Sequence, residues 1–386
     1  MPQPASDLSA PVRVPRGTVR VDSLGRVSSD VLILGTGLIG TSLGIALSRK
    51  GFRIQLNDPS PTAQALARDL GAGTLLDSTS PDPTLVIVAA PPDVAAAVVA
   101  DALERWPAAV VTDVASVKRI IHEELVRRGA DLSRYVGSHP MAGRERTGAG
   151  AARGDLFEGR AWVVVPAESS SRYAVEMVTA IAHAAGSAVS TMDAAAHDEA
   201  VAAISHMPQV FASLVAAQLR GLDDRALALS GQGVRDVTRI AASDPRLWTQ
   251  ILAGNAGAIR DVLVRVQDNL GDLVAALDRI DRGDGIGGLE VVNRTVLHGN
   301  AGRARLPGKH GAAPTAYEPV TVVIPDEPGS LGRLLTDIGE AGVNLEDVRL
   351  DHGLEQPFGL AEIMVLPAAV EHLHTVLTEQ GWRVLD

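Results

Sequence analysis

Hydrophobic and polar positions follow three different patterns along the chain. In residues 29–168, short aliphatic runs alternate with segments of helical periodicity. Near-continuous apolar strands separated by helices are typical of a parallel sheet covered on both faces. The pattern therefore predicts an α/β domain with strands at Val31–Leu34, Ile54–Asn57, Leu85–Val88, Ala109–Thr112 and Trp162–Val165.

Residues 169–298 have a helical pattern throughout. One predicted helix runs from an N-cap at Asp193 to Leu219, and we expect Pro208 to kink it. Ser243–Pro245 marks a second helix start. A third helix, Asn255–Arg282, has apolar positions at three-and-four spacing. Such a helix packs either against a partner subunit or within an intramolecular bundle, and the pattern fits both. We expect a homodimer.

The remaining segments are a tail, a linker and a small domain. Residues 1–28 are predicted to be a flexible tail. Residues 299–316 are rich in Gly, Ala, Arg and Pro without apolar periodicity, which indicates a linker. Residues 317–386 alternate strand and helix patterns in the order βαββαβ, which predicts a ferredoxin-like domain.

Composition narrows the function. The chain has 386 residues, a net charge of −11, no cysteine and 3% aromatic residues. These values exclude disulfides and thiol chemistry and disfavour nucleic-acid binding. No apolar run reaches the roughly 18 residues of a membrane helix, and residues 1–30 lack a secretory signal, so we expect a cytoplasmic protein. His197 and His206 should lie on opposite helix faces, so no metal site is expected.

A glycine motif carries the first chemical prediction. Gly35-Thr-Gly-Leu-Ile-Gly40 follows a predicted strand and opens a helix, and Asp58 ends the next strand. This spacing is typical of a dinucleotide site: the turn approaches a pyrophosphate and the acid accepts ribose hydroxyls. It favours NAD over NADP, although Arg53 and Asn57 leave NADP open. The predicted cofactor-binding residues here are Gly35, Gly37, Leu38, Ile39, Gly40 and Asp58.

Further polar loops should follow other strands at the same sheet edge. Pro91 and Ser116 are expected beside the cofactor. His139 stands before Pro140 in a glycine-flanked segment, which predicts an imidazole on a rigid loop that can take a proton from a hydroxyl. The alternatives are a structural histidine bonded to backbone, and a Ser116 that only caps a helix.

Two arginines predict an anion site. Arg235 and Arg239 share one helix face, and guanidinium groups suit carboxylates. The alternative is that both are surface arginines paired with Asp236 or Asp244.

Together, these segments resemble the prephenate dehydrogenase family, which includes the arogenate dehydrogenases. The resemblance covers about residues 31–280. The strings that carry it are Gly35–Gly40, Asp113-Val-Ala-Ser-Val-Lys118, Gly137-Ser-His-Pro-Met-Ala-Gly143, His197-Asp198 with Ile204-Ser-His-Met-Pro208, and Asp236-Val-Thr-Arg-Ile-Ala241 leading to Ser243-Asp-Pro245 and Trp248.

The resemblance implies a Rossmann-type domain, a helical dimerisation domain and NAD-dependent oxidative decarboxylation of prephenate to 4-hydroxyphenylpyruvate in tyrosine biosynthesis, or the matching reaction of arogenate. His139 matches the catalytic histidine, Arg239 the arginine that binds the substrate carboxylate, and Ser116 a serine near the hydroxyl. Glu145, His206 and Trp248 match pocket positions. Arg144 and Gln232 depart from the family pattern, which leaves the choice between the two substrates open.

The C-terminal region resembles an ACT regulatory domain. Asp326-Glu-Pro-Gly-Ser-Leu331 and Gly342-Val-Asn344 carry this resemblance. It implies an amino-acid effector, with tyrosine as the candidate and Asp326, Gly329 and Asn344 as effector-binding residues. The alternative is a domain that only assists dimerisation.

Two other functions compete. A 3-hydroxyacid dehydrogenase would place a catalytic lysine on the first long helix after the sheet, and residues 194–219 contain none. A non-catalytic NAD and amino-acid sensor would not need His139, Arg239 and Ser116 together.

Overall fold

The computed structural model describes residues 20–21, 27–28, 30–143, 148–283, 285–306, 317–352 and 358–385. The chain divides into two compact units, Met1–Val266 and Gln267–Asp386. The division falls inside one helix, α11 (Ala256–Asp281), and the predicted domain boundaries stay predictions.

A parallel sheet forms the centre of the first unit. Its strand order is β5-β4-β3-β6-β7, and all four strand pairs are parallel. This confirms the parallel sheet predicted from the first four apolar runs. The strands are β3 (Asp30–Leu34), β4 (Arg53–Asn57), β5 (Thr74–Leu75), β6 (Leu85–Val88) and β7 (Val110–Asp113). A short antiparallel pair, β1 (Arg20–Val21) and β2 (Val27–Ser28), precedes them.

A second, three-stranded sheet of order β10-β9-β8 follows. Its strands are β8 (Val136–Pro140), β9 (Ala161–Pro166) and β10 (Ala188–Thr191). A bridge between Val111 and Tyr135 links it to β7. The parallel prediction is wrong for the fifth apolar run, because β9 pairs antiparallel with β8. Strand β10 was not predicted, since three of its four residues are exposed and give little apolar signal.

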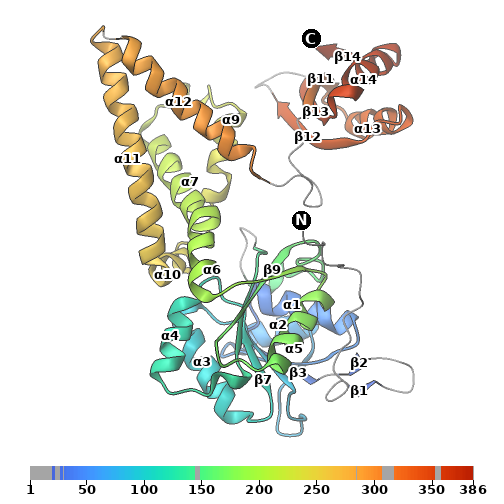
Figure 1. The fold of residues 1–386 in the computed structure, drawn as a ribbon. Helices are drawn as coiled ribbons and strands as arrows, with labels where there is room; N and C mark the ends of the chain where they lie inside the picture. Colours follow the sequence, from blue (N-terminus) through green and yellow to red (C-terminus); the bar gives the residue numbers. More distant parts are fainter. Residues whose placement is uncertain are drawn as a thin grey trace, which may run out of the picture. The chain divides into compact units, whose positions relative to one another are not determined.

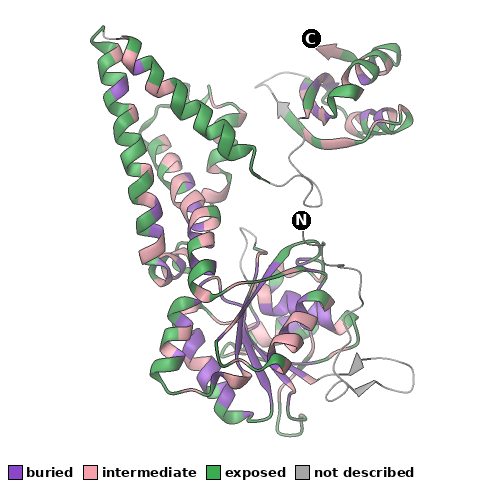
Figure 2. Ribbon diagram, in the orientation of Figure 1, coloured by how far each residue is buried: buried purple, intermediate pink, exposed green. Residues whose placement is uncertain are grey.

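Helices cover both faces of the central sheet, as Figure 1 shows. One face packs on α1 (Leu38–Arg49), α2 (Pro61–Asp69) and α5 (Arg172–Ala184), and the other on α3 (Pro92–Arg105) and α4 (Arg119–Arg127). Val31 and Ile33 belong to the first core and Leu32 to the second, because successive side chains point to opposite faces of a strand. Figure 2 shows this buried centre in purple.

The helical part begins at Asp193, whose side chain accepts the N–H of Ala196 and caps α6 (Ala194–Val201) as predicted. A π-helix, η3 (Ala202–His206), then leads into α7 (Met207–Gln218). Pro208 has no N–H for the carbonyl of Ile204, which explains why the α-helical bonding changes here. The expected kink at Pro208 stays a prediction, and the helix changes type in the residues before it.

Shorter elements complete the helical part. They are η4 (Leu219–Gly221), α8 (Asp224–Leu227), α9 (Gln232–Thr238), η5 (Arg239–Ala241) and α10 (Pro245–Gly254). The helix α10 begins within the predicted start Ser243–Pro245, and Asp244 caps it. Ile259 and Val262 of α11 pack on Ala202.

The continuous helical run Ala194–Gly221 is long and apolar enough to cross a membrane by length and composition. This differs from the expectation that no apolar run has that length. The indication is weak, because core helices of soluble proteins pass the same test. Its buried polar residues include His197, Asp198 and His206, which belong to the site described below.

The second unit contains α12 and a four-stranded antiparallel sheet of order β12-β13-β11-β14. Helix α12 (Gly285–Arg303) continues into the stretch predicted to be a linker. The chain order β11-α13-β12-β13-α14-β14 is the predicted βαββαβ order. The bounds are β11 (Glu318–Pro325), α13 (Ser330–Glu340), β12 (Leu345–His352), β13 (Phe358–Val365), α14 (Pro367–Glu379) and β14 (Arg383–Leu385).

Candidate active site

A cleft of about 1150 Å³ lies at the carboxyl ends of the central strands. Residues after β3, β4, β6 and β7 form one side, and residues of η3, η5 and α10 form the other. The cleft brings together most of the residues predicted from sequence, namely Gly35, Gly37, Leu38, Ile39, Asp58, Pro91, Ser116, His139, His206, Arg239 and Trp248.

The glycine turn is held by close backbone packing. Gly35 has φ +104°, and a Cβ there would lie 2.4 Å from the carbonyl oxygen of Ala89. A Cβ at Gly40 would lie 1.9 Å from the carbonyl oxygen of Gly35, so Gly40 supports the turn and does not line the cleft. Gly37 has open space at its Cβ position and begins α1 without a side-chain cap. The start of α1 can therefore receive an anion on its backbone N–H groups.

Asp58 stands beside this turn. Its carboxylate accepts the N–H of Thr36 at 2.7 Å and that of Ser60 at 2.8 Å. Arg53 lies at the other end of β4 and donates to Asp30 at 2.6 Å, which places it away from the cleft. Of the two residues that left NADP open, only Asn57 lines the cleft.

A buried ion pair supports the loop after β7. Lys118 Nζ pairs with Asp113, and the two side chains are 1% and 0% exposed. Asp113 also accepts the Tyr135 hydroxyl at 2.7 Å and the N–H of Ala115 at 2.9 Å. Burial lowers the pKa of Lys118 and raises that of Tyr135 well above its usual value. This network fixes the segment that carries Ser116.

His139 lies near the end of strand β8, opposite Val163 of β9, and not on the predicted loop. Pro140, which donates no hydrogen bond, ends the strand. His139 Nδ1 is 2.9 Å from His197 Nε2. Burial, and then the charges of His197, Lys118 and His206, lower the pKa of His139 well below its usual value. A neutral imidazole therefore borders the cleft.

His197 and His206, which were expected on opposite helix faces, are both buried. The π-helix between them changes the angle per residue, so α-helical counting fails there. Asn255 Nδ2 donates to the Asp198 carbonyl at 2.7 Å and lies 3.2 Å from His206 Nδ1. Burial lowers the pKa of His206 to about 4. Among the described residues, no group of three His, Cys, Asp or Glu could hold a metal ion.

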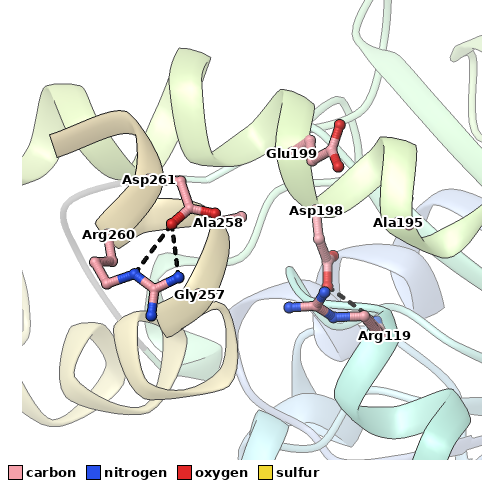
Figure 3. Close-up of a pocket in the computed structure, with 8 residues that line it drawn as sticks. All are labelled: Arg119, Ala195, Asp198, Glu199, Gly257, Ala258, Arg260 and Asp261. Atoms are coloured by element: carbon pink, nitrogen blue, oxygen red, sulfur yellow. Dashed lines mark hydrogen bonds and ion pairs between the residues drawn. The ribbon is translucent and has the colours of Figure 1, made fainter. Parts of the chain in front are cut away.

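Asp198 connects this helix to α4. Its carboxylate accepts the N–H of Lys118 at 2.9 Å and that of Arg119 at 3.0 Å, and it is 2.8 Å from His197 Nδ1. Figure 3 shows Asp198 beside Arg119 at the edge of a separate pocket of about 180 Å³. Asp198 is thus held at the start of α4 by two backbone donors.

The other predicted residues differ in whether they line the cleft. Ser116 is not a helix cap, because α4 begins after Lys118. Arg239 lines the cleft whereas Arg235 does not, and both are exposed. Gln232 donates to Asp236 and lies outside the cleft lining. Glu145 and Arg144 lie outside the described residues.

The predicted effector residues are not brought together within one copy of the chain. Gly329, with φ +94°, and Asp326 lie between β11 and α13. Asn344 precedes β12. Leu345 and Glu318 both pair with Val365, whereas Pro325 pairs with Phe358, so Asn344 lies at the opposite end of the sheet from Asp326.

Sequence reasoning gave no chemical role to His197, Asp198, Asn255 or the Asp113–Lys118 pair. The adjacent His197 and Asp198 on an apolar helix were a signal, since such a helix buries polar groups only where they have partners. The contact of His197 with His139 depends on tertiary packing and has no signal in local sequence.

Comparisons with known proteins agree with this site. Residues 43–191 match the prephenate dehydrogenase nucleotide-binding domain, and residues 193–285 match its dimerization domain. NovF of Streptomyces niveus, whose name assigns it to the prephenate dehydrogenases, is 36% identical over 361 residues, covering 91% of this chain and 98% of NovF. Residues 1–316 alone are too few to make up 91% of the 386 residues, so the match to NovF extends into the C-terminal region.

Two further relatives agree. Prephenate dehydrogenase of Bacillus subtilis is 24% identical over 360 residues, covering 88% of this chain and 93% of its own. The structure of Aquifex aeolicus prephenate dehydrogenase with hydroxyphenyl propionate and NAD+ has a TM-score of 0.60 and 26% identity, covering 70% of this chain and 98% of its own. This chain therefore belongs to the prephenate dehydrogenase family of oxidoreductases.

Proposed function

We propose that this protein catalyses the NAD-dependent oxidative decarboxylation of prephenate to 4-hydroxyphenylpyruvate. The observation that carries the proposal is that His139, Ser116 and Arg239 line the same cleft as the glycine turn and Asp58. The Aquifex relative, solved with NAD+ and a hydroxyphenyl acid, supports it.

The cofactor would bind at the glycine turn. Gly37, Leu38 and Ile39 line the cleft at the uncapped start of α1, which suits the pyrophosphate. Asp58 would accept the ribose hydroxyls and repel a 2′-phosphate. When bound, NAD supplies the acceptor for the hydride.

His139 would act on the ring hydroxyl. Its neutral imidazole accepts the hydroxyl hydrogen bond, which supports positive charge at the carbon as the hydride leaves. The ring carboxylate then leaves as carbon dioxide, and its bonding electrons complete the aromatic ring. Arg239 would bind a substrate carboxylate, while Glu145, His206 and Trp248 would shape the pocket.

The direct test is reduced-cofactor formation with prephenate and with arogenate, each with NAD and with NADP. We expect turnover with NAD and a preference that decides between the two ring acids. His139→Asn should lose about 10²–10⁴-fold in kcat while still binding NAD. An NAD-binding protein that turns over neither acid would favour the sensor alternative.

Arg239 has a matched control on the same surface. Because Arg239 is exposed, Arg239→Ala should remove a charge-assisted contact of about 1.5–3 kcal/mol and raise KM by about 10- to 100-fold. Arg235→Ala removes an exposed arginine that does not line the cleft, and its KM should stay unchanged. An equal effect of both substitutions would contradict the assignment.

Helix α11 supports a homodimer. Leu270, Val274 and Leu277 recur at four and three residues and are 51–53% exposed, which suits an apolar seam against a second copy. Light scattering on the full chain should give twice the mass of 40.2 kDa. A Leu270→Glu/Leu277→Glu variant should shift it toward the monomer, and a monomeric wild type would refute the seam.

The C-terminal region would act as an ACT-type regulatory domain that binds tyrosine between two copies. Its βαββαβ order supports this, and pairing of two copies could join Asp326 and Gly329 of one to Asn344 of the other. Tyrosine should change the initial rate of wild type, and Asn344→Ala should weaken that response. A rate independent of tyrosine would favour the dimer-only alternative.

A further inference from the structure

We propose that His197 and Asp198 are positioning residues that hold the proton of His139 on Nδ1 and leave its Nε2 as the hydrogen-bond acceptor. The inference deepens the proposed function, and its kinetic test rests on that function.

The Asp198 side chain is 2% exposed and accepts two backbone N–H groups at the start of α4, those of Lys118 and Arg119. These donors suit an ionised carboxylate, which can only accept hydrogen bonds. The nitrogen that faces it, His197 Nδ1 at 2.8 Å, must therefore carry a proton.

The proton of His197 determines the role of the His139 nitrogen that faces it. A neutral imidazole with a proton on Nδ1 has an unprotonated Nε2. His197 Nε2 is 2.9 Å from His139 Nδ1, so a neutral His197 makes His139 Nδ1 the donor. The ring centroids lie 5.1 Å apart at an interplanar angle of 70°, which suits an edge contact between the nitrogens and excludes a stacked pair.

The second ring nitrogen of His139, Nε2, is the one left for a ligand. With Nδ1 protonated, the neutral His139 has Nε2 as its only acceptor. His139 lines the cleft and turns its Nδ1 to His197, so the proposal assigns Nε2 to the substrate hydroxyl. In the opposite tautomer Nε2–H would meet the hydroxyl as a donor, and the base would be lost.

His206 offers an internal contrast. Asn255 Nδ2 must face the Asp198 carbonyl, because the amide oxygen would meet another acceptor there. The same Nδ2 faces His206 Nδ1 at 3.2 Å, which makes that nitrogen an acceptor and leaves the proton of a neutral His206 on Nε2. The cleft thus borders one histidine with an acceptor Nε2 and one with a donor Nε2.

The first test is kinetic. His197→Leu should lower kcat by about 10-fold or more, with KM for prephenate and NAD affinity kept close to wild type. His197→Gln should recover part of kcat, because its amide oxygen can accept from His139 Nδ1. His183→Leu changes an exposed histidine of α5 and serves as the matched control. A kcat of His197→Leu within twofold of wild type, with His139→Asn inactive, would overturn the relay and leave the proposed function standing.

The second test does not need turnover. Nitrogen-15 NMR of the histidine rings in wild-type protein distinguishes protonated from bare ring nitrogens, with His139→Asn and His206→Asn used for assignment. We expect His139 protonated on Nδ1 and His206 on Nε2. A proton on His139 Nε2 overturns the proposal even if the enzyme is active, and the expected pattern supports it even if prephenate is not turned over or His197→Leu fails to fold.

Discussion

Replacing Lys118 by methionine should destabilise the first unit and alter the pH dependence of the site. Methionine has a similar length but no charge, so Asp113 would keep its burial and lose its ion pair. Removing one partner of a buried pair costs about 3–5 kcal/mol. Two donors to Asp113 remain, the Tyr135 hydroxyl and the Ala115 N–H, so we expect the lower end, about 3 kcal/mol.

The assay is urea unfolding followed by circular dichroism, with a melting experiment beside it. A loss of about 3 kcal/mol corresponds to a Tm lower by about 6–12 °C for a domain of this size. Lys118→Met/Asp113→Asn should recover most of the loss, since both charges are removed together. Lys50→Met, at the exposed end of α1, should stay within about 0.5 kcal/mol of wild type.

The same variant has a functional readout. The Lys118 charge lowers the pKa of His139, so its removal should raise that pKa and move the acidic limb of the rate profile to higher pH. A stability within about 1 kcal/mol of wild type would refute the ion-pair reasoning. A shift of the limb to lower pH would refute the electrostatic reasoning.

Gly40→Ala should destabilise the turn because its Cβ meets the Gly35 carbonyl, whereas Gly37→Ala should keep stability and weaken NAD binding measured by calorimetry. Asp58→Asn should lower the ratio of kcat/KM for NAD over NADP by about 10-fold or more, and an unaltered ratio would argue against its ribose role. Below pH 6.5 the unfolded state protonates His206 while the folded state, with a pKa of about 4, does not. Stability to urea should therefore fall between pH 6.5 and 4 by at most about 3 kcal/mol, and less in His206→Gln.

The sequence predicted best those features that depend on local pattern. The run Leu85–Val88 is β6 with the same bounds, because a buried central strand is apolar at every position. The cap at Asp193 and the helix start at Ser243–Pro245 were found because a short acceptor side chain before a helix satisfies its first N–H groups. The glycine turn was found because its spacing is set by backbone approach, here Gly35 against Ala89.

Features that depend on tertiary pairing were missed. The direction of β9 relative to β8 is invisible in an apolar run, since both orientations bury the same side chains. His139 was placed on a loop because glycine and proline normally interrupt strands, whereas here Gly137 is enclosed by Tyr135, Val165 and Lys118 and keeps its place in the ladder. The strand propensity of a residue depends on its local sequence and does not include tertiary contacts of this kind.

The π-helix shows how one local departure shapes the site. Pro208 takes part in none of the hydrogen bonds described for the site. Because it lacks an N–H, it removes the donor that the Ile204 carbonyl would use in an α-helix. The five residues that end at His206 therefore turn less per residue, and His206 meets Asn255. His197 lies on α6 before this change and meets His139. Because Asp198 and Asn255 also contact each other, both histidines are oriented from the same point on α6. In the proposed mechanism the sheet supplies the base, and His197 and Asp198 of α6 decide which nitrogen of that base is available.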